Sequence, residues 1–345
     1  MRRRTLLTAA GGAAFGLAGC ASGGSTPSGP GRPTTLEKVT YLTGFGITGQ
    51  DSFAYLAVEK GFFLDAGLQV QIKPGGGTGA NLKLLQGGQA EFAVVDLTGA
   101  LLEYGRGGYR DFRVFAAVYQ RSVSCIMALA SRGITVPRDL EGKTVGYTEG
   151  GVNKTLFPTY AQLAGVDQAK IRWVNLPPPQ LRPTLLAGTL DAITEIVIGK
   201  PAVETADCGP TGAGELRRCR EVTMLPYSNY LGDLYGNALA TTLSTAMGNP
   251  GIVKRFRDAM LKALAYAIGH PKEAGQILAK HQPTYKAEAA TAEVQAAEPY
   301  VRSGVTIGDV DETRVMQSIS LLQGAQAIPD TGLRPEHVVS LELTP

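Results

Sequence analysis

Two acidic side chains stand at the ends of apolar, strand-like runs, where they could hold a polar ligand. Asp96 follows the run Phe92 to Val95, and Glu195 lies near the end of the run Leu190 to Ile198. A carboxylate at such a position is costly to bury unless it meets a partner. Both residues are therefore predicted to lie near a ligand site.

A glycine-rich turn offers a second kind of binding group. Gly75, Gly76 and Gly77 precede Thr78, which begins a helix-like segment that runs through Gln86. Open backbone N–H groups at a helix start suit an anion or a carbonyl oxygen. The same residues are also typical of a tight turn followed by a helix N-cap, so both interpretations stay open.

The sequence shows no signature of bond-making chemistry. His270, His281 and His337 are isolated from one another, and no His-Glu-x-x-His spacing predicts a metal site. No Gly-x-Ser-x-Gly, paired-carboxylate or Cys–His pattern occurs. We therefore expect a binding protein without a metal or cofactor, rather than an enzyme.

The N-terminus has the pattern of an export signal. Arg2 to Arg4 precede the uncharged stretch Thr5 to Ala18, which is too short to span a bilayer as a stable helix. Leu17-Ala18-Gly19-Cys20 resembles the bacterial lipobox, which implies that Cys20 receives a lipid. Residues 1–20 are thus predicted to be a lipoprotein signal peptide, and the protein to be anchored on the outer face of the cytoplasmic membrane. Arg3 to Leu7 also resembles the twin-arginine motif, so the export route stays open.

A flexible tether and a balanced charge follow the signal. Residues 21–36 are rich in Gly, Ser and Pro, a composition that cannot bury apolar surface. The net charge of +3 comes from the arginines of the signal, which leaves 30 basic and 30 acidic residues. We expect no binding to nucleic acid, and contact with the membrane only through the lipid.

Two further cysteines flank a short loop. Cys208 and Cys219 enclose residues 209–218, and an oxidising compartment favours a disulfide that closes this loop. Two free thiols are the alternative. Cys125 lies in an apolar run and is predicted to be a small buried hydrophobe.

The elements that must position these groups alternate between strands and helices, which predicts an α/β fold with mostly parallel sheets. The pattern of strand, glycine turn and helix occurs twice. Gly87 to Val95 and Gly188 to Ile196 are predicted to be equivalent units. The predicted strands are 38–42, 68–73, 92–95, 114–118, 124–130, 144–147, 171–175 and 190–198. The predicted helices are 52–60, 78–86, 155–164, 180–187, 251–269, 271–280, 286–299 and 309–324. Pro177 to Pro179 are predicted to be extended and to lead into the helix 180–187.

The length predicts two lobes. About 310 residues follow the tether, more than one hydrophobic core usually serves. Two similar halves would enclose a cleft, where small ligands bind. We expect lobe 1 at residues 37–122 and 236–345, because the helical last third should return to the first half, and lobe 2 at residues 123–235.

Several motifs in order resemble the nitrate/sulfonate/taurine and thiamine-pyrimidine-precursor family of ABC transporter substrate-binding proteins. The run Glu59-Lys60-Gly61-Phe62-Phe63-Leu64-Asp65-Ala66-Gly67-Leu68-Gln69-Val70 is similar to the opening motif of that family. Residues 74–77, 87–96, 142–146, 235–239, 255–256, 265–268 and 270–274 continue the resemblance. It implies the type II periplasmic-binding fold, in which two α/β lobes are joined by two crossover strands, here with a helical C-terminal region.

The resemblance also implies where a ligand binds. Family members place contacts at the carboxyl ends of strands and at helix starts that face the cleft. Asp51 is also compatible with a helix N-cap, and Tyr119 and Tyr235 with simple packing between lobes. The candidate ligand-binding residues are Phe45, Gln50, Asp51, Gly76, Gly77, Thr78, Asp96, Tyr119, Glu149, Asn153, Glu195, Asp233 and Tyr235.

These candidates favour one ligand type. Carboxylates and aromatic rings are plentiful among them and arginine is nearly absent, which suits an amine-bearing heterocycle such as a thiamine-pyrimidine precursor. A sulfonate, taurine or nitrate binder is the alternative and should show positive charge or many donors. A secreted enzyme on this fold, such as a pyrimidine synthase that consumes an internal histidine, is the alternative from another class. The expected protein is a monomer that closes on its ligand and delivers it to an ABC permease in the membrane.

Overall fold

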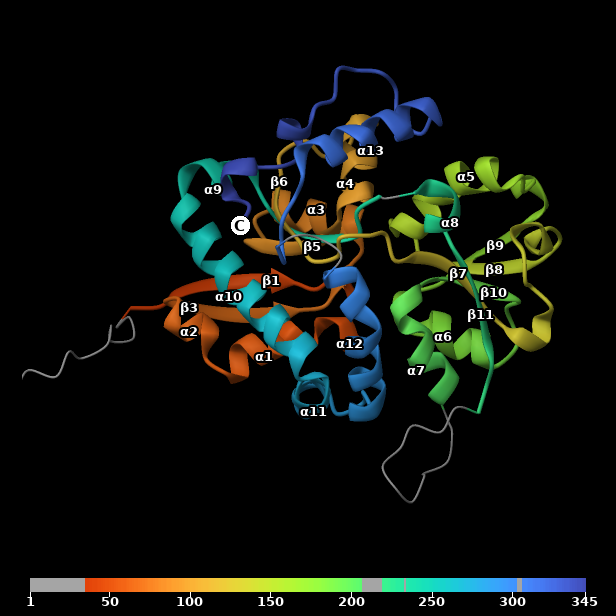
Figure 1. The fold of residues 1–345 in the computed structure, drawn as a ribbon, viewed down its shortest axis with the longest axis horizontal. Coiled ribbons are helices and arrows are strands. Elements are labelled where there is room, and N and C mark those ends of the chain that lie inside the picture. The colour runs from red at the N-terminus through yellow and green to blue at the C-terminus, as the bar shows by residue number, and fades with distance from the viewer. Residues whose placement is uncertain (1–34, 207–218, 233, 303–305) are drawn as a thin grey trace, which may run out of the picture. The chain divides into compact units, whose positions relative to one another are not determined.

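The structure is a computed structural model that describes residues 35–206, 219–232, 234–302 and 306–345 (Figure 1). The predicted signal peptide, Cys20, almost the whole tether, Cys208 and Asp233 lie outside these residues. Among the helices that the structure does describe, none combines the length and the apolar character needed to cross a bilayer.

The first sheet has the strand order β3-β1-β5-β12-β6. β1 is parallel to β3 and to β5, whereas β12 is antiparallel to both of its neighbours. β12 enters this sheet from a part of the chain more than a hundred residues after β6. The strands are β1 (Glu37–Leu42), β3 (Leu68–Lys73), β5 (Phe92–Asp96), β6 (Arg113–Ala117) and β12 (Asn237–Thr241).

The second sheet has the order β11-β7-β10-β8-β9, which repeats the plan of the first. β8 is parallel to β9 and to β10, and β7 is the antiparallel strand beside β10. The prediction of two similar α/β halves is therefore confirmed. The strands are β7 (Ser124–Leu129), β8 (Thr144–Tyr147), β9 (Arg172–Asn175), β10 (Ala192–Ile196) and β11 (Val222–Pro226); β2 (Phe45–Gly46) and β4 (Gly75–Gly76) form a small ladder of their own.

Helices cover both faces of each sheet (Figure 1). In the first half they are α1 (Ser52–Glu59), α2 (Phe62–Asp65), α3 (Thr78–Gln86) and α4 (Leu97–Gly105). In the second half they are α5 (Val152–Ala164), α6 (Pro178–Leu186), α7 (Lys200–Thr205) and α8 (Ser228–Leu231). The last third supplies α9 (Leu243–Gly248), α10 (Pro250–Gly269), α11 (Pro271–His281), α12 (Ala287–Val301) and α13 (Glu312–Gly324).

Alternation along the strands builds two apolar layers. In β1 and β5, Tyr41 and Phe92 point toward α1 and α10, whereas Leu42 and Ala93 point toward α3 and α4. Phe92 stacks on Phe256 of α10 with ring centroids 4.0 Å apart. Each such buried aromatic side chain contributes about 1.5–3 kcal/mol of hydrophobic stabilisation, so α10 is fixed firmly on this face.

The repeat is offset by one residue from the alignment expected above. Gly88 and Gly188 both adopt positive φ, at 65° and 76°. Three residues later, Glu91 accepts a hydrogen bond from the Thr40 N–H, and Asp191 accepts one from the Thr144 N–H. Residues 88–96 therefore correspond to 188–196, whereas the sequence alignment had matched Gly87 to Gly188.

Two segments carry the chain between the sheets and bond to each other. The N–H groups of Val118 and Tyr119 both donate to the Asn237 carbonyl at 2.8 Å. The Ser122 N–H donates to the Leu234 carbonyl at 2.6 Å. A change in the relative position of the two sheets would therefore bend both crossovers together.

Local differences from the predicted elements have simple causes. Pro178 and Pro179 were expected to be extended, but they occupy the first turn of α6, where proline needs no N–H partner. α5 begins at Val152, three residues before the predicted start, immediately after a glycine turn. α4 follows β5 without a linker and was missed, because a strand and a helix that are both apolar share one uninterrupted hydrophobic run.

Candidate ligand-binding site

The glycine turn before α3 is held by hydrogen bonds within the protein. The Gly75 N–H donates to Thr43 Oγ1 at 3.0 Å, and the Gly76 N–H donates to Asn81 Oδ1 at 3.1 Å. The Gly77 N–H donates to the Gly44 carbonyl at 2.9 Å. The open N–H groups expected at the triplet are thus occupied, and the tight-turn interpretation is correct for these three residues.

The same turn brings the two halves into contact. Gly77 has a φ of 98°, and a methyl group on it would lie 3.2 Å from the Gly150 carbonyl and 3.3 Å from the Phe45 ring. A methyl group on Gly99 would lie 3.1 Å from Thr78 and from Val152. Glycine at these positions lets the starts of α3, α4 and α5 approach one another closely.

Asp96 ends β5 and caps α4. Its Oδ1 accepts a hydrogen bond from the Gly99 N–H at 2.9 Å, while its own N–H donates to Thr78 Oγ1 at 3.0 Å. Only 5% of the residue is exposed. Burial raises its pKa to about 7 against the opposing backbone hydrogen bonds.

Asp51 is a second buried carboxyl at the carboxyl end of β1. Its Oδ2 accepts from the Thr48 N–H at 2.9 Å, and only 2% of the residue is exposed. It stands before α1 but its side chain does not cap that helix. Burial raises its pKa to about 7, and Glu293 adds to the rise. Within the described part of the chain, neither Asp51 nor Asp96 forms an ion pair with a basic side chain.

In the second half, Asn153 links three elements. Its Nδ2 donates to the Glu195 carbonyl at 2.7 Å, and its Oδ1 accepts from Ser124 Oγ at 2.7 Å. The Tyr227 hydroxyl donates to the Asn153 carbonyl at 2.9 Å. The start of α5 is therefore held to β7 and β10, so the predicted residues Asn153 and Glu195 do lie together.

An ion network that the sequence did not reveal connects the halves. Arg182 of α6 donates from Nε to Glu195 at 2.7 Å and from Nη1 to Glu293 of α12 at 3.1 Å. Glu293 also accepts from the Gly49 N–H and the Tyr285 hydroxyl, both at 2.6 Å. The side chains of Arg182, Glu195 and Glu293 are 20%, 12% and 1% exposed.

These contacts determine the charge of the network. Burial lowers the pKa of Arg182, but the two carboxylates raise it and the net direction is upward. Burial raises the pKa of Glu293 against the attraction of Arg182. Arg182 was not among the predicted candidates, yet it pairs with one of them, Glu195, and its guanidinium is balanced by two carboxyl groups.

The remaining predicted residues divide into two groups. Gln50 Oε1 accepts from Asn237 Nδ2 at 3.2 Å. Burial raises the pKa of Tyr119, and the nearby Asp51 carboxylate raises it further. The Tyr235 hydroxyl instead accepts from the Asp311 N–H at 2.9 Å, and its ring lies under the Arg314 guanidinium, so this side chain packs against α13. Glu149 is exposed, and its backbone N–H donates to Asn175 Oδ1 at 3.1 Å.

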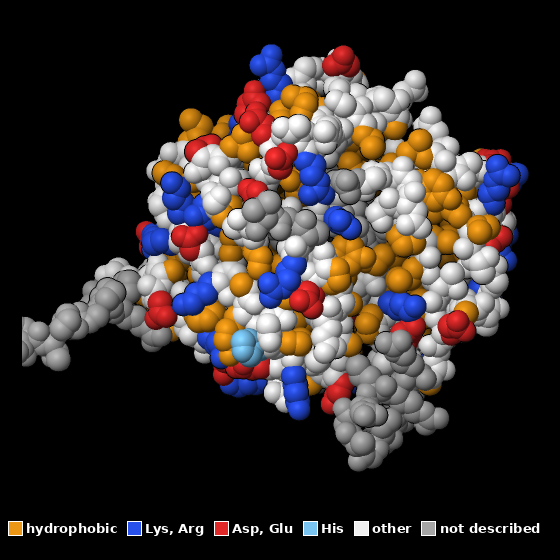
Figure 2. Space-filling view, viewed as in Figure 1, with side chains coloured by type: hydrophobic (Ala, Val, Ile, Leu, Met, Phe, Trp, Pro, Cys, Tyr) orange, Lys and Arg blue, Asp and Glu red, His pale blue; other side chains and the backbone are white. Residues whose placement is uncertain are grey.

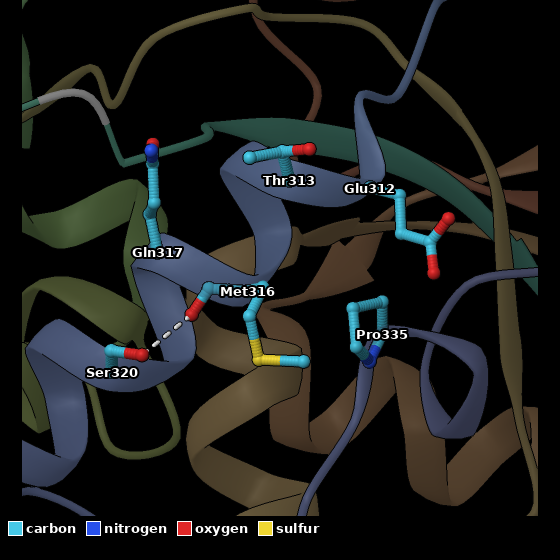
Figure 3. A pocket seen from close by; sticks show the side chains of 6 residues that line it. All are labelled: Glu312, Thr313, Met316, Gln317, Ser320 and Pro335. Carbon is cyan, nitrogen blue, oxygen red and sulfur yellow. Dashed lines mark hydrogen bonds between the residues drawn. The ribbon is translucent and has the colours of Figure 1, made fainter.

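A surface cavity along α13 is a poor candidate for this site. It has a volume of about 470 Å³ and, as Figure 3 shows, its wall comes from one helix and Pro335. Ser320 in that wall donates to the Met316 carbonyl of its own helix. None of the predicted ligand residues lines it. Figure 2 shows acidic and basic side chains mixed over the visible face, without a large area of one sign.

Comparison with known proteins points to one family. A family model described as "NMT1/THI5 like" matches residues 50–274. A formylaminopyrimidine-binding protein of Halalkalibacterium halodurans is 26% identical over 160 residues, which cover 46% of this chain and about half (47%) of that relative. A putative thiamine biosynthesis protein of Haemophilus influenzae is 24% identical over 251 residues, 72% of this chain and 74% of the relative.

The fold also matches solved structures. The alkanesulfonate-binding protein SsuA of Xanthomonas axonopodis pv. citri, bound to MOPS, superposes with a TM-score of 0.66 at 14% identity. The match covers 91% of this chain and 99% of that one. The chain therefore has the two-lobed periplasmic-binding fold, with a helical C-terminal region.

Proposed function

Because the chain belongs to the NMT1/THI5-like family, we propose that it is an extracytoplasmic solute-binding protein that delivers a small molecule to an ABC importer in the membrane. The observation that carries this proposal is the meeting of strand ends and helix starts from both sheets around Phe45, Gly77 and Asn153. Such a junction lets a ligand contact both halves at once, and that contact would stabilise the closed arrangement.

We propose an amine-bearing heterocycle, of the thiamine-pyrimidine-precursor type, as the ligand. Asp51 and Asp96 are buried carboxyl groups without a basic partner among the described residues, so an amino group on the ligand would supply the missing donor. The name of the formylaminopyrimidine-binding relative supports the same class. A sulfonate or nitrate would instead need a free cation, and Arg182 is already bound to Glu195 and Glu293.

An enzyme that consumes an internal histidine is less well supported. His270 stacks on Tyr266, His281 bonds to Glu59, and His337 stacks on Tyr104. All three rings are therefore engaged outside the candidate site. We propose binding without turnover, and mass spectrometry of recovered ligand would check it.

We further propose the organisation predicted from the sequence. Residues 37–122 with 236–345 would form lobe 1, and residues 123–235 lobe 2, joined at the bonded crossovers. Cys20 would carry the lipid, and a Cys20→Ala variant should then appear in the soluble fraction. The Cys208–Cys219 disulfide stays a prediction, because Cys208 lies outside the described residues.

A binding panel tests the ligand class. Formylaminopyrimidine, hydroxymethylpyrimidine, taurine, hexanesulfonate and nitrate would each be titrated into the mature protein by calorimetry, with thermal unfolding in parallel. We expect an aminopyrimidine to bind and to raise the unfolding temperature. Asp51→Asn and Asp96→Asn should weaken it, whereas Asp258→Asn on the surface of α10 should not. Binding of sulfonates alone would refute the proposed ligand.

A further inference from the structure

A second cavity opens between α6, α7 and the start of α12. Its volume is about 550 Å³, within the range of small-molecule sites. Leu186 and Val203 line it from the second half, and Tyr285 and Ala289 line it from the last third of the chain. None of the predicted ligand residues belongs to its wall.

The charged side chains in this wall are all basic. Arg182, Arg220 and Lys286 line the cavity, and no acidic side chain among the described residues does. Arg182 is balanced by Glu195 and Glu293, which leaves two positive charges. Arg220 donates a hydrogen bond to the Ala206 carbonyl oxygen at the end of α7, so this oxygen already has a partner.

The position of Lys286 strengthens the attraction for an anion. Lys286 is exposed and forms no ion pair within the described residues. It is also the N-cap residue of α12, and no side chain caps that helix start. The positive end of the α12 dipole therefore adds to the field of the ammonium group, and the exposed Glu288 in the first turn offsets part of that field.

We propose that this cavity is a second binding site, for a small organic anion with an apolar body. Leu186, Ala187 and Ala202 would contact the apolar part, while Lys286 and Arg220 would pair with a carboxylate or sulfonate. This inference does not depend on which ligand occupies the site proposed above.

The cavity is placed to influence that other site. Its wall joins α6 and α7 to residues 284–289, so an anion would hold together the same two parts that Arg182 connects through Glu293. Arg182 also contacts Glu195, whose carbonyl accepts from Asn153. A bound anion should thus favour the closed arrangement and raise the affinity of the other ligand, and the effect must be reciprocal.

Titration with matched probes tests the site. Hexanoate and 1-hexanesulfonate would be compared with 1-hexanol and hexylamine, which have the same apolar chain but no negative charge. In the mature protein we expect the two anions to bind and the other two to bind at least tenfold more weakly. Equal binding of hexanol would overturn the proposal.

Variants locate the binding. Lys286→Gln combined with Arg220→Gln, and separately Ala202→Phe, which fills the cavity, should each weaken hexanoate at least tenfold. Lys254→Gln, an exposed lysine on α10, should leave it unchanged. Circular dichroism of each variant would verify the fold. Unchanged hexanoate affinity in folded variants would refute the site, as would direct competition between hexanoate and an aminopyrimidine.

Discussion

Replacing Arg182 by Met removes the cation that joins the two halves. Methionine keeps most of the length and apolar surface of the side chain but loses the hydrogen bonds to Glu195, Glu293 and Tyr285. Glu195 and Glu293 would then be two buried carboxyl groups without a counter-ion. The other partners of Glu293, the Gly49 N–H and the Tyr285 hydroxyl, would remain.

The size of the effect follows from burial. Breaking a buried pair by removing one partner costs about 3–5 kcal/mol, because the other charge is left uncompensated. Glu293 is 1% and Glu195 12% exposed, so solvent can relieve little of this cost. We expect a loss of about 4 kcal/mol in the free energy of unfolding at pH 8, which corresponds to a fall of about 6 °C in Tm for a chain of this length.

The loss should depend on pH with a definite sign. Burial already raises the pKa of Glu293, and without the attraction of Arg182 it rises further in the folded variant, while an unfolded Glu keeps a value of about 4.3. Carboxyl groups with a raised folded pKa favour the folded state most below the unfolded pKa, and this advantage is lost as pH rises. The deficit of the variant relative to the wild type should therefore be small at pH 5 and largest at pH 8.

Urea unfolding of the wild type and of Arg182→Met at pH 5, 6.5 and 8 measures this difference in the free energy of unfolding. Arg302→Met is the matched control, since Arg302 pairs with Glu298 at 3.3 Å on the exposed surface of α12. Its cost should stay below about 1 kcal/mol at every pH. The reasoning fails if Arg182→Met costs no more than Arg302→Met at pH 8, or if its deficit shrinks as pH rises.

Three further predictions follow from single positions. Asp51 and Asp96 have pKa values of about 7 in the folded protein, against about 3.9 for an unfolded Asp, so the free energy of unfolding of the wild type should fall as pH rises from 4 to 7. In urea unfolding, Asp51→Asn and Asp96→Asn should each make the free energy of unfolding less dependent on pH over this range. Gly77→Ala should lower the free energy of unfolding by about 1–3 kcal/mol, because φ is 98° and the new methyl group would contact Phe45. The control is Gly324→Ala, where the new methyl group would have open space around it. It should change the free energy of unfolding by less than about 1 kcal/mol in the same assay. Tyr41→Phe removes a buried hydroxyl that has no hydrogen-bond partner among the described residues. Thermal unfolding should therefore show a stability that is unchanged or higher by up to about 1 kcal/mol. A clear loss of stability would contradict this prediction.

The repeated α/β pattern could be predicted because it depends on residues that are close together in the sequence. Alternating apolar residues give β1 and β3, and glycines mark the ends of α3 and α1. The proximity of Asn153 to Glu195 also followed from strand ends and helix starts. The orientation of Tyr235 could not be predicted, because a tyrosine beside a crossover can turn to either side, and here its ring lies under Arg314 while its hydroxyl accepts from the Asp311 N–H.

Glu293 was missed although the sequence contains a faint signal for it. It falls on the same helical face as Ala290, Val294 and Ala297, all of which are buried. A carboxylate within an apolar stripe indicates a partner from another element, but nothing in the sequence identifies that partner. Arg182 is 111 residues away, and only the packing of α12 against α7 brings the two together.

The one-residue offset of the repeat explains why the side chains of Asp96 and Glu195 make different contacts. Since residue 96 corresponds to 196, Asp96 is matched by Ile196, and Glu195 by Val95. Successive residues of a strand point to opposite faces, so a shift of one places the two carboxylates on opposite sides of equivalent strands. Asp96 therefore caps the following helix, while Glu195 points to the side of α6 and meets Arg182. Similar halves thus present unlike groups to the space between them, which is what recognition of an asymmetric ligand requires.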